Sequence, residues 1–370
     1  MSLELPTSHR IPVSWLLEHG SETIRLRTLR ELSPPGSVTA ETLASAEEAV
    51  LQSKSAQAVV RKQKDNGIWG GSLLALAASA KEGIKEVGTI PNYRRLLQLG
   101  YPRTGRPFKL ADRVLFRLLS RDEDPALYFE FGKFAKESAG AAEWVREFIR
   151  EAAAAALAEA GFIEDPRLRG AAHKIATAVS TFLRSPVAEK PFSRSAAKTI
   201  LNAEAHPPTW YSVAMIAAMP NLQRERAGFT ERLGQYLAQP APKKAYVIQL
   251  GKRALKPDLM LLGDPIAADA KGTPKDLPLA LHFIELLARI HALHTAPVST
   301  RVLARLLSEC DERGVWRPKG LKSAPRPGHK ITYHSWELHP EAKSPDSKLV
   351  EVTFRLALIT TLLGWPVERT

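Results

Sequence analysis

The apolar residues of this chain recur with a period close to 3.6 along most of its length, and no other feature restricts the fold as much. This spacing places apolar side chains on one side of an α-helix. Strand-like alternation is rare, and its best example is AYVIQL at 245–250, which suits an extended linker or a small hairpin arm. The sequence therefore predicts an all-α fold. The predicted helices are 21–32, 109–120, 141–160, 166–183, 222–237, 277–290, 299–310 and 352–363.

Several of these helices begin with a capping signal. A Ser, Thr or Asp oxygen accepts the unsatisfied N–H groups of the first turn, and proline loses nothing there by lacking a donor. The predicted caps are Ser21, Asp165 before Pro166, Thr209 before Trp210, and Thr273 before Pro274.

The helix junctions repeat along the chain. A helix often ends at a glycine, as at Gly20, Gly100 and Gly161, and a short turn then leads into an amphipathic helix that carries arginine. The predicted helix 299–310 has one apolar stripe, whereas 277–290 and 352–363 are apolar on nearly all sides. Alternation of partly exposed and fully buried helices is typical of a closed α/α barrel or a curved solenoid.

Two loops share a spacing that chance seldom produces twice in one chain. Gln63, Gly67 and Trp69 form Q-x-x-x-G-x-W, and Cys310, Gly314 and Trp316 repeat it with Cys in the Gln position. This QW-like motif resembles the repeat of the terpenoid cyclase and protein prenyltransferase superfamily, which includes the squalene cyclases.

The resemblance implies an α/α toroid, that is, a closed or partly open ring of helical hairpins. In that family the Gln caps a helix end, and the Trp packs beside it between neighbouring hairpins, so the six residues named above would be structural. Gly364 and Trp365 would follow the last inner helix of the ring. An open α-solenoid is the alternative fold.

The catalytic motifs of the resembled family are missing from this chain. The nearest match to the acidic cyclase motif is 122–125, where proline follows the second Asp, and the chain has no adjacent Asp pair for magnesium diphosphate. Ser308 stands where the zinc-binding Asp of the prenyltransferases would precede Cys310. A zinc site built from Cys310, Asp311 and nearby histidines is a weaker alternative to an apolar role for the cysteine. We therefore predict no metal and no cofactor.

The remaining catalytic candidates are His282 and Glu285. They lie three residues apart in a predicted buried helix, so they share one face and could act as an acid/base pair beside a central cavity. A buried histidine tied to a carboxylate for packing is the alternative, and the sequence leaves open whether the protein is an enzyme.

The chain is strongly basic, because 52 Lys and Arg against 39 Asp and Glu leave 52 − 39 = +13. This charge favours acidic partners such as nucleic acid, an anionic membrane, a phosphorylated ligand such as a diphosphate, or an acidic protein. Arg103, Arg106 and Lys109 form a turn-rich candidate anion site, and 317–348 is a second basic loop, expected to be solvated. A stripe of Arg25, Arg27 and Arg30, extended by helix 109–120, could face a duplex.

Length and composition complete the expectation. A single cysteine fits a reducing compartment, and no uninterrupted run reaches about 18 apolar residues. We expect a soluble, cytoplasmic protein that is not an integral membrane protein. The 370 residues would form one toroid-like domain over 1–370, with irregular insertions near 239–276 and 317–348.

Two functions follow from these observations. The first is a prenyltransferase-like or cyclase-like protein that binds an apolar, isoprenoid-type ligand in a central cavity. The second is a non-enzymatic basic helical-repeat scaffold that binds nucleic acid or an acidic protein. The residue-specific motif favours the first, since net charge alone is generic.

Overall fold

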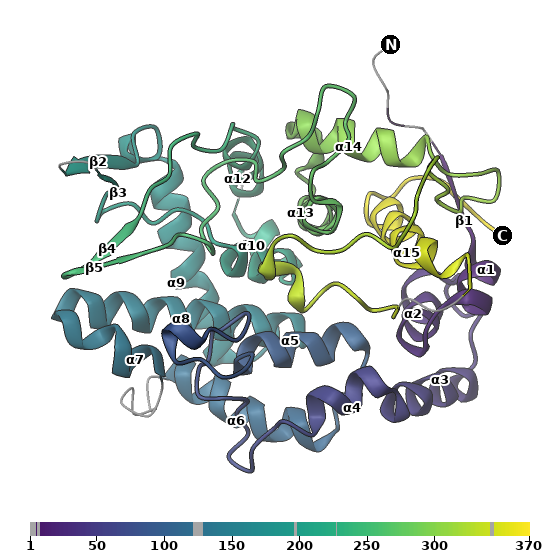
Figure 1. Ribbon diagram of the computed structural model, residues 1–370, viewed down its shortest axis with the longest axis horizontal. Coiled ribbons are helices and arrows are strands. Elements are labelled where there is room, and N and C mark those ends of the chain that lie inside the picture. Colours follow the sequence, from purple (N-terminus) through teal and green to yellow (C-terminus); the bar gives the residue numbers. More distant parts are fainter. Residues whose placement is uncertain (1–4, 6–7, 121–128, 196–197, 227, 341–343) are drawn as a thin grey trace. The chain divides into compact units, whose positions relative to one another are not determined.

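The computed structural model describes residues 5, 8–120, 129–195, 198–226, 228–340 and 344–370 (Figure 1). These residues are predominantly helical, and the strands among them form only two-stranded ladders of three or four residues each. The predicted all-α class is confirmed. None of the helices formed by these residues combines the length and apolar composition that a membrane span requires.

The chain forms two compact units, and each unit is built from separate stretches of sequence. Unit 1 comprises 1–61, 95–103 and 266–370, and unit 2 comprises 62–94 and 104–265. The helix α5 (Thr89–Leu99) contributes its first part to unit 2 and its last part to unit 1. One continuous domain over 1–370 stays a prediction.

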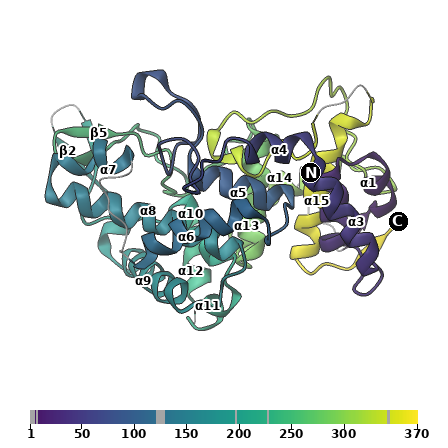
Figure 2. The ribbon, with the colours of Figure 1, turned by 90° about the horizontal axis from the view of Figure 1, so that it is seen from below.

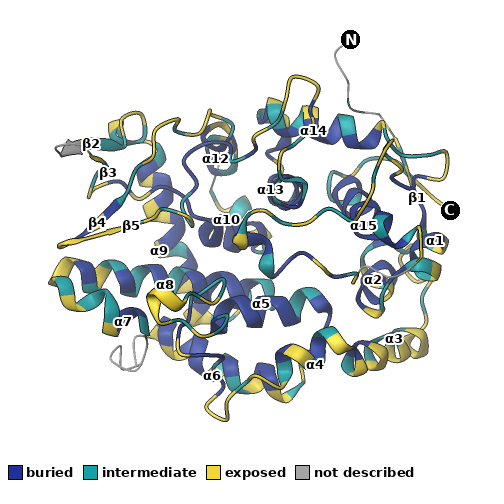
Figure 3. Cartoon of the chain, in the orientation of Figure 1, coloured by how far each residue is buried: buried dark blue, intermediate teal, exposed yellow. Residues whose placement is uncertain are grey.

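Unit 1 is organised around two helices that are buried on most sides. In Figure 3, α13 and α15 are almost entirely in the buried colour, as predicted for helices that are apolar nearly all round. The helix α14 buries Val302, Leu303 and Leu306 while Arg301 is exposed, which confirms its amphipathic pattern. The elements of unit 1 are β1 (His9–Ile11), α1 (Val13–His19), α2 (Glu22–Arg27) with a following π-turn (Thr28–Leu32), α3 (Ala40–Gln52), α4 (Lys54–Val60), the end of α5, α13 (Leu277–Arg289), the 3-10 turn Leu293–Thr295, α14 (Pro297–Leu307), the 3-10 turn Lys330–Tyr333, α15 (Ser347–Leu362) and β6 (Val367–Arg369), which pairs in parallel with β1.

Unit 2 is organised around α8, which lies beside α6, α9 and α10 (Figure 2). The run 152–158 of α8 is mostly alanine and is buried, and such small side chains let the neighbouring helices approach closely. The elements of unit 2 are the 3-10 turn Ala80–Glu82, the start of α5, α6 (Arg106–Ser120), α7 (Phe129–Lys133), the 3-10 turn Ala135–Glu137, α8 (Ala139–Glu159), α9 (Pro166–Leu183), the 3-10 turn Pro186–Ala188, β2 (Phe192–Ser195), β3 (Lys198–Leu201), α10 (Trp210–Ala217), α11 (Pro220–Arg224), α12 (Phe229–Leu237), β4 (Ile248–Leu250) and β5 (Arg253–Leu255).

Most of the sequence-based boundaries are confirmed within a turn, and the strand at 245–250 is confirmed as β4 of a hairpin. The single helix predicted at 222–237 is wrong. Gly228 has φ +66°, a left-handed conformation that interrupts the helix, so α11 and α12 are separate.

The caps at Ser21, Asp165 and Thr209 are confirmed. The cap predicted at Thr273 is wrong, because α13 starts later. The Oδ1 atom of Asp276 accepts the N–H of Leu279 at 3.0 Å, and Asp276 is the cap.

Candidate functional site

The first QW-like loop is a tight corner within unit 2. Gln63 and Trp69 face each other in an isolated antiparallel bridge, and the N–H of Lys64 donates to Ile68 at 2.9 Å. Gly67 has φ +88°, and a Cβ atom there would lie 2.6 Å from the carbonyl oxygen of Leu110. Only glycine fits both the conformation and the space.

The second loop forms the same corner within unit 1. Cys310 and Trp316 make the equivalent bridge, and the N–H of Asp311 donates to Val315 at 2.9 Å. Gly314 also has φ +88°, and a Cβ atom there would overlap the carbonyl oxygen of Arg10. The two sequence motifs therefore correspond to one local structure that occurs in both units.

A threonine completes each corner. The backbone N–H of Trp69 donates to Oγ1 of Thr89, and that of Trp316 donates to Oγ1 of Thr353, both at 3.1 Å. Both threonines are buried. Sequence reasoning missed them, although a signal exists, since each is followed eleven positions later by Gly, an aromatic residue and Pro, at 100–102 and 364–366.

The two corners differ at their first position. The Nε2 atom of Gln63 donates to the carbonyls of Gly67 at 3.0 Å and Pro107 at 2.8 Å, so this side chain ties the corner to the first turn of α6. Cys310 makes only a weak contact, from Sγ to the carbonyl of Leu306 at 3.7 Å. Burial raises the pKa of the Cys310 thiol to about 12, with smaller contributions from Asp311 and Glu309. The thiol is therefore protonated at neutral pH and is a poor nucleophile.

The catalytic candidates His282 and Glu285 are both buried in α13. One carboxylate oxygen of Glu285 accepts from Nη2 of Arg289 at 2.9 Å, and the other accepts from Nη1 of Arg355 at 2.8 Å. Burial alone raises the pKa of Glu285, but Arg289, Arg355 and Arg27 outweigh it and hold that pKa well below its ordinary value. Such a carboxylate is an ion-pair acceptor, so a proton-transfer role for the pair stays a prediction.

The ion pairs of Glu285 belong to a larger buried network in unit 1, which holds 333–339 in place. Arg355 donates to the carbonyl of Ser335, and Arg95 donates to those of Trp336 and Glu337. In return, Glu351 accepts the N–H of Leu338 at 3.1 Å. Part of the predicted insertion 317–348 is thus built into the core. The expectation of a wholly solvated loop is wrong there, because buried charges satisfy its backbone groups.

The predicted arginine stripe does not form as expected. Arg27 is buried, and its Nε atom donates to Glu31 at 2.5 Å while its Nη1 atom donates to Gln98 at 2.8 Å. Arg25 binds the carbonyl of Glu18 at 2.9 Å, and Arg30 pairs with Glu47. Arg27 is unavailable to a partner because its charge is already matched inside unit 1.

The candidate anion site at the turn before α6 is divided between the units. Arg103 belongs to unit 1 and is half-buried, while Arg106 and Lys109 belong to unit 2 and are exposed. Arg106 lies 3.0 Å from Oδ1 of Asp65, in an exposed ion pair. An anion site formed by these three residues stays a prediction.

Three hollows can be described from their lining residues. One of about 350 Å³ lies at the Cys310 corner beside His9, Arg10 and Glu368, and one of about 260 Å³ lies beside Lys64 and Lys85. The third, of about 20 Å³, has room for about one water molecule.

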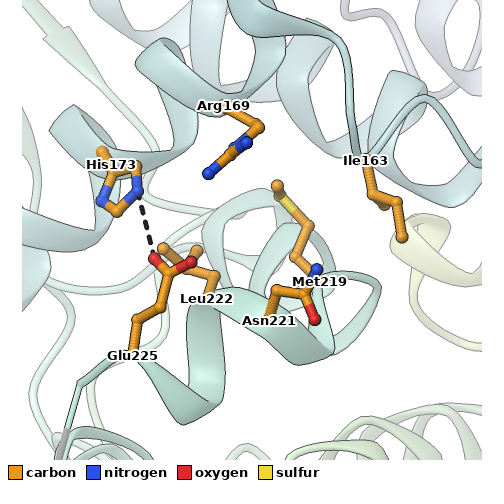
Figure 4. A pocket seen from close by; sticks show the side chains of 7 residues that line it. All are labelled: Ile163, Arg169, His173, Met219, Asn221, Leu222 and Glu225. Carbon is orange, nitrogen blue, oxygen red and sulfur yellow. Dashed lines mark ion pairs between the residues drawn. The ribbon is translucent and has the colours of Figure 1, made fainter.

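Figure 4 shows this smallest hollow, where His173 and Glu225 form an ion pair of 3.2 Å below Arg169. Charged side chains line all three hollows, so none offers the apolar lining expected for an isoprenoid. The central apolar cavity stays a prediction.

Two further sites concern acidic and metal-binding residues. The segment 122–125 lies outside the described residues. Within the described part of the chain, no three His, Cys, Asp or Glu side chains gather as a metal site would require.

In comparisons with protein-family models, with curated proteins and with solved structures, nothing matches this chain.

Proposed function

We propose that this protein is a non-enzymatic helical-repeat scaffold that binds an acidic macromolecule through exposed basic side chains. One observation carries the proposal. Among the described residues, the buried charged side chains are four arginines and four carboxylates, which cancel. The net charge of +13 therefore rests on side chains outside this buried set. The buried set is Arg27, Arg94, Arg95, Arg355, Glu130, Asp264, Glu285 and Glu351.

The interior supports a scaffold in preference to a catalyst. Glu285, the carboxylate of the candidate acid/base pair, is neutralised by Arg289 and Arg355, and Arg94 is likewise matched by Glu159 at 2.7 Å. Charges that are paired in this way are not free to move protons.

The architecture that we propose is a divergent α/α toroid, related to the terpenoid cyclase and prenyltransferase superfamily. The matched corners at Gly67–Trp69 and Gly314–Trp316 support it, because the motif's Gly and Trp serve structural purposes in both units. An apolar ligand in a central cavity is the function that the superfamily itself would imply, and it stays a prediction.

Heparin affinity chromatography combined with native mass spectrometry tests the proposed function. We expect the purified protein to be retained at low salt and released by salt, since heparin is a polyanion. We also expect native mass spectrometry to show a mass without a bound lipid. Failure to bind heparin at low salt, or a co-purified isoprenoid, would contradict the scaffold proposal.

A further inference from the structure

Two β-hairpins lie side by side in unit 2. The strands β2 and β3 pair in an antiparallel hairpin, and so do β4 and β5. Val247, just before β4, joins them, because its N–H donates to Thr199 at 3.1 Å and its carbonyl accepts from Leu201 at 2.9 Å. Figure 1 shows the four strands together at the left of the view. We call the described residues of 190–201 and of 243–256 the basic arm.

The basic arm has an unusual charge composition. Its two segments contain eight Lys and Arg and no Asp or Glu. Six of the eight are lysines that are exposed, and within the described part of the chain none of them forms an ion pair. These six lysines are Lys190, Lys198, Lys243, Lys244, Lys252 and Lys256.

The arm is anchored to the rest of unit 2 through one face. Ile248 and Leu250 of β4 are buried, whereas Gln249 between them is exposed. Arg253 of β5 donates to Glu137 at 2.6 Å, and Gly251 in the hairpin turn lies against the same residue. Among the described side chains of the arm, Arg253 is the cation that forms an ion pair, and it attaches the hairpin, whereas the six lysines remain at the surface.

The physical state of these lysines points to a polyanionic partner. Six like charges on two adjacent hairpins repel each other, and a partner with closely spaced negative charges removes that repulsion. A nucleic-acid backbone carries one charge per phosphate along an extended line, about one per 1.7 Å of a DNA duplex. Lysine is a point charge without the bidentate geometry of arginine, which suits contacts to phosphates better than recognition of base edges.

We propose that the basic arm binds the phosphate backbone of nucleic acid without sequence selectivity. This inference rests on the proposed scaffold function and names its partner and its surface. A two-stranded β-ribbon also has dimensions that the major groove of a duplex accepts. The arm supplies two such ribbons, with Lys252 in the turn between β4 and β5, Lys198 in β3, and the other lysines before or after the strands.

A salt series of fluorescence anisotropy titrations with a short labelled DNA duplex of mixed sequence tests the inference. If each of the six lysines neutralises one phosphate, the logarithm of the association constant falls with the logarithm of salt concentration with a slope of about −5. The triple variant Lys243→Ala, Lys244→Ala, Lys252→Ala should reduce the magnitude of that slope by about 3. A shuffled duplex should bind with the same affinity.

The matched control is the triple variant Lys54→Ala, Lys62→Ala, Lys81→Ala, which removes the same charge from exposed lysines outside the arm. We expect its slope to stay close to that of the unmodified protein. Equal losses in the two variants, or tighter binding of polyglutamate than of DNA, would overturn the inference. Retention on heparin without DNA binding would refute nucleic acid as the partner of the basic arm, but it would still agree with the proposed scaffold function. Circular dichroism melting of both variants confirms that the fold is intact.

Discussion

At the scale of single residues, each corner tryptophan buries a large side chain, and its backbone N–H donates to a threonine hydroxyl. Trp69 is fully buried and Trp316 is 3% exposed. The indole Nε1 of Trp316 also donates to Glu309 at 3.0 Å, so its polar edge is satisfied. A large aromatic side chain in this position contributes more area than any other single residue could.

Replacement of a corner tryptophan should therefore be costly. We expect Trp69→Ala and Trp316→Ala each to lower the free energy of unfolding by about 3 to 5 kcal/mol, as large-to-small changes in a core do. Chemical denaturation measures this. Trp365→Ala, at a partly exposed position, is the control and should cost less. Near-neutral effects of the two corner substitutions would contradict the structural role that we assign to these tryptophans.

Glu151 of α8 is a second residue with a measurable signature. The hydroxyl of Thr209 and the N–H of Ser212, the latter at 3.0 Å, both donate to its Oε1 atom. Burial nevertheless raises the pKa of Glu151 to about 7, from an ordinary 4.5. Between these two pH values the folded protein keeps a proton that the unfolded chain has lost.

The sign of the pH dependence follows from this difference in bound protons. As pH rises from about 4.5 to about 7, the shifted ionisation of Glu151 should lower the free energy of unfolding by about 1 to 3 kcal/mol. The variant Glu151→Gln has no proton to lose and should lack this slope. Urea unfolding of both proteins over that range isolates the contribution, and identical slopes would show that Glu151 titrates normally.

At the scale of elements, a buried threonine hydroxyl connects each corner to a helix that lies later in the sequence. Thr89 begins α5, whereas Thr353 lies inside α15, yet both present Oγ1 to the N–H of a corner tryptophan. Each bond thus links its helix to the corner, and at the first corner the Thr89 hydroxyl also donates to the carbonyl of Trp69 at 3.3 Å. A buried N–H without an acceptor costs free energy, so the hydroxyl matters more than the volume of the side chain.

Removal of the hydroxyl alone tests this connection. Thr89→Val and Thr353→Val keep the shape of the side chain and should each cost about 1 to 3 kcal/mol, because the tryptophan N–H loses its acceptor. Thr→Ser at the same positions keeps the oxygen and should lose less. Thermal unfolding of the four variants makes the comparison. A valine variant as stable as its serine counterpart would refute the role of the hydroxyl as an acceptor.

At the scale of the whole molecule, two compact units share one chain whose path crosses between them more than once. Each unit has its own buried helices, α13 and α15 in unit 1 and α8 in unit 2. Separate cores favour local opening of one unit without the other.

Hydrogen–deuterium exchange can measure this independence. We expect Trp316→Ala to increase amide exchange chiefly in unit 1, and Trp69→Ala chiefly in unit 2, because each tryptophan is buried within its own unit. An equal increase throughout the chain after either substitution would instead support the single cooperative domain that the sequence predicts.

The sequence by itself determined the features that depend on local order. The 3.6-residue period placed α9 at its observed bounds, and the spacing of Gly67 and Gly314 identified both corners, because a left-handed turn beside a carbonyl admits only glycine. Local patterns also located the caps at Ser21, Asp165 and Thr209. These features need only a few neighbouring residues to be specified.

Only the tertiary structure determined which charged side chains lie close to one another. Arg27 looks like a surface residue in sequence but is buried beside Glu31 and Gln98, and Glu285 is neutralised by Arg355, which lies 70 positions away. Likewise, the lysines of the basic arm come together only because 243–256 folds back beside 190–201. Burial and long-range pairing set the energy of a charge, and periodicity carries no information about either.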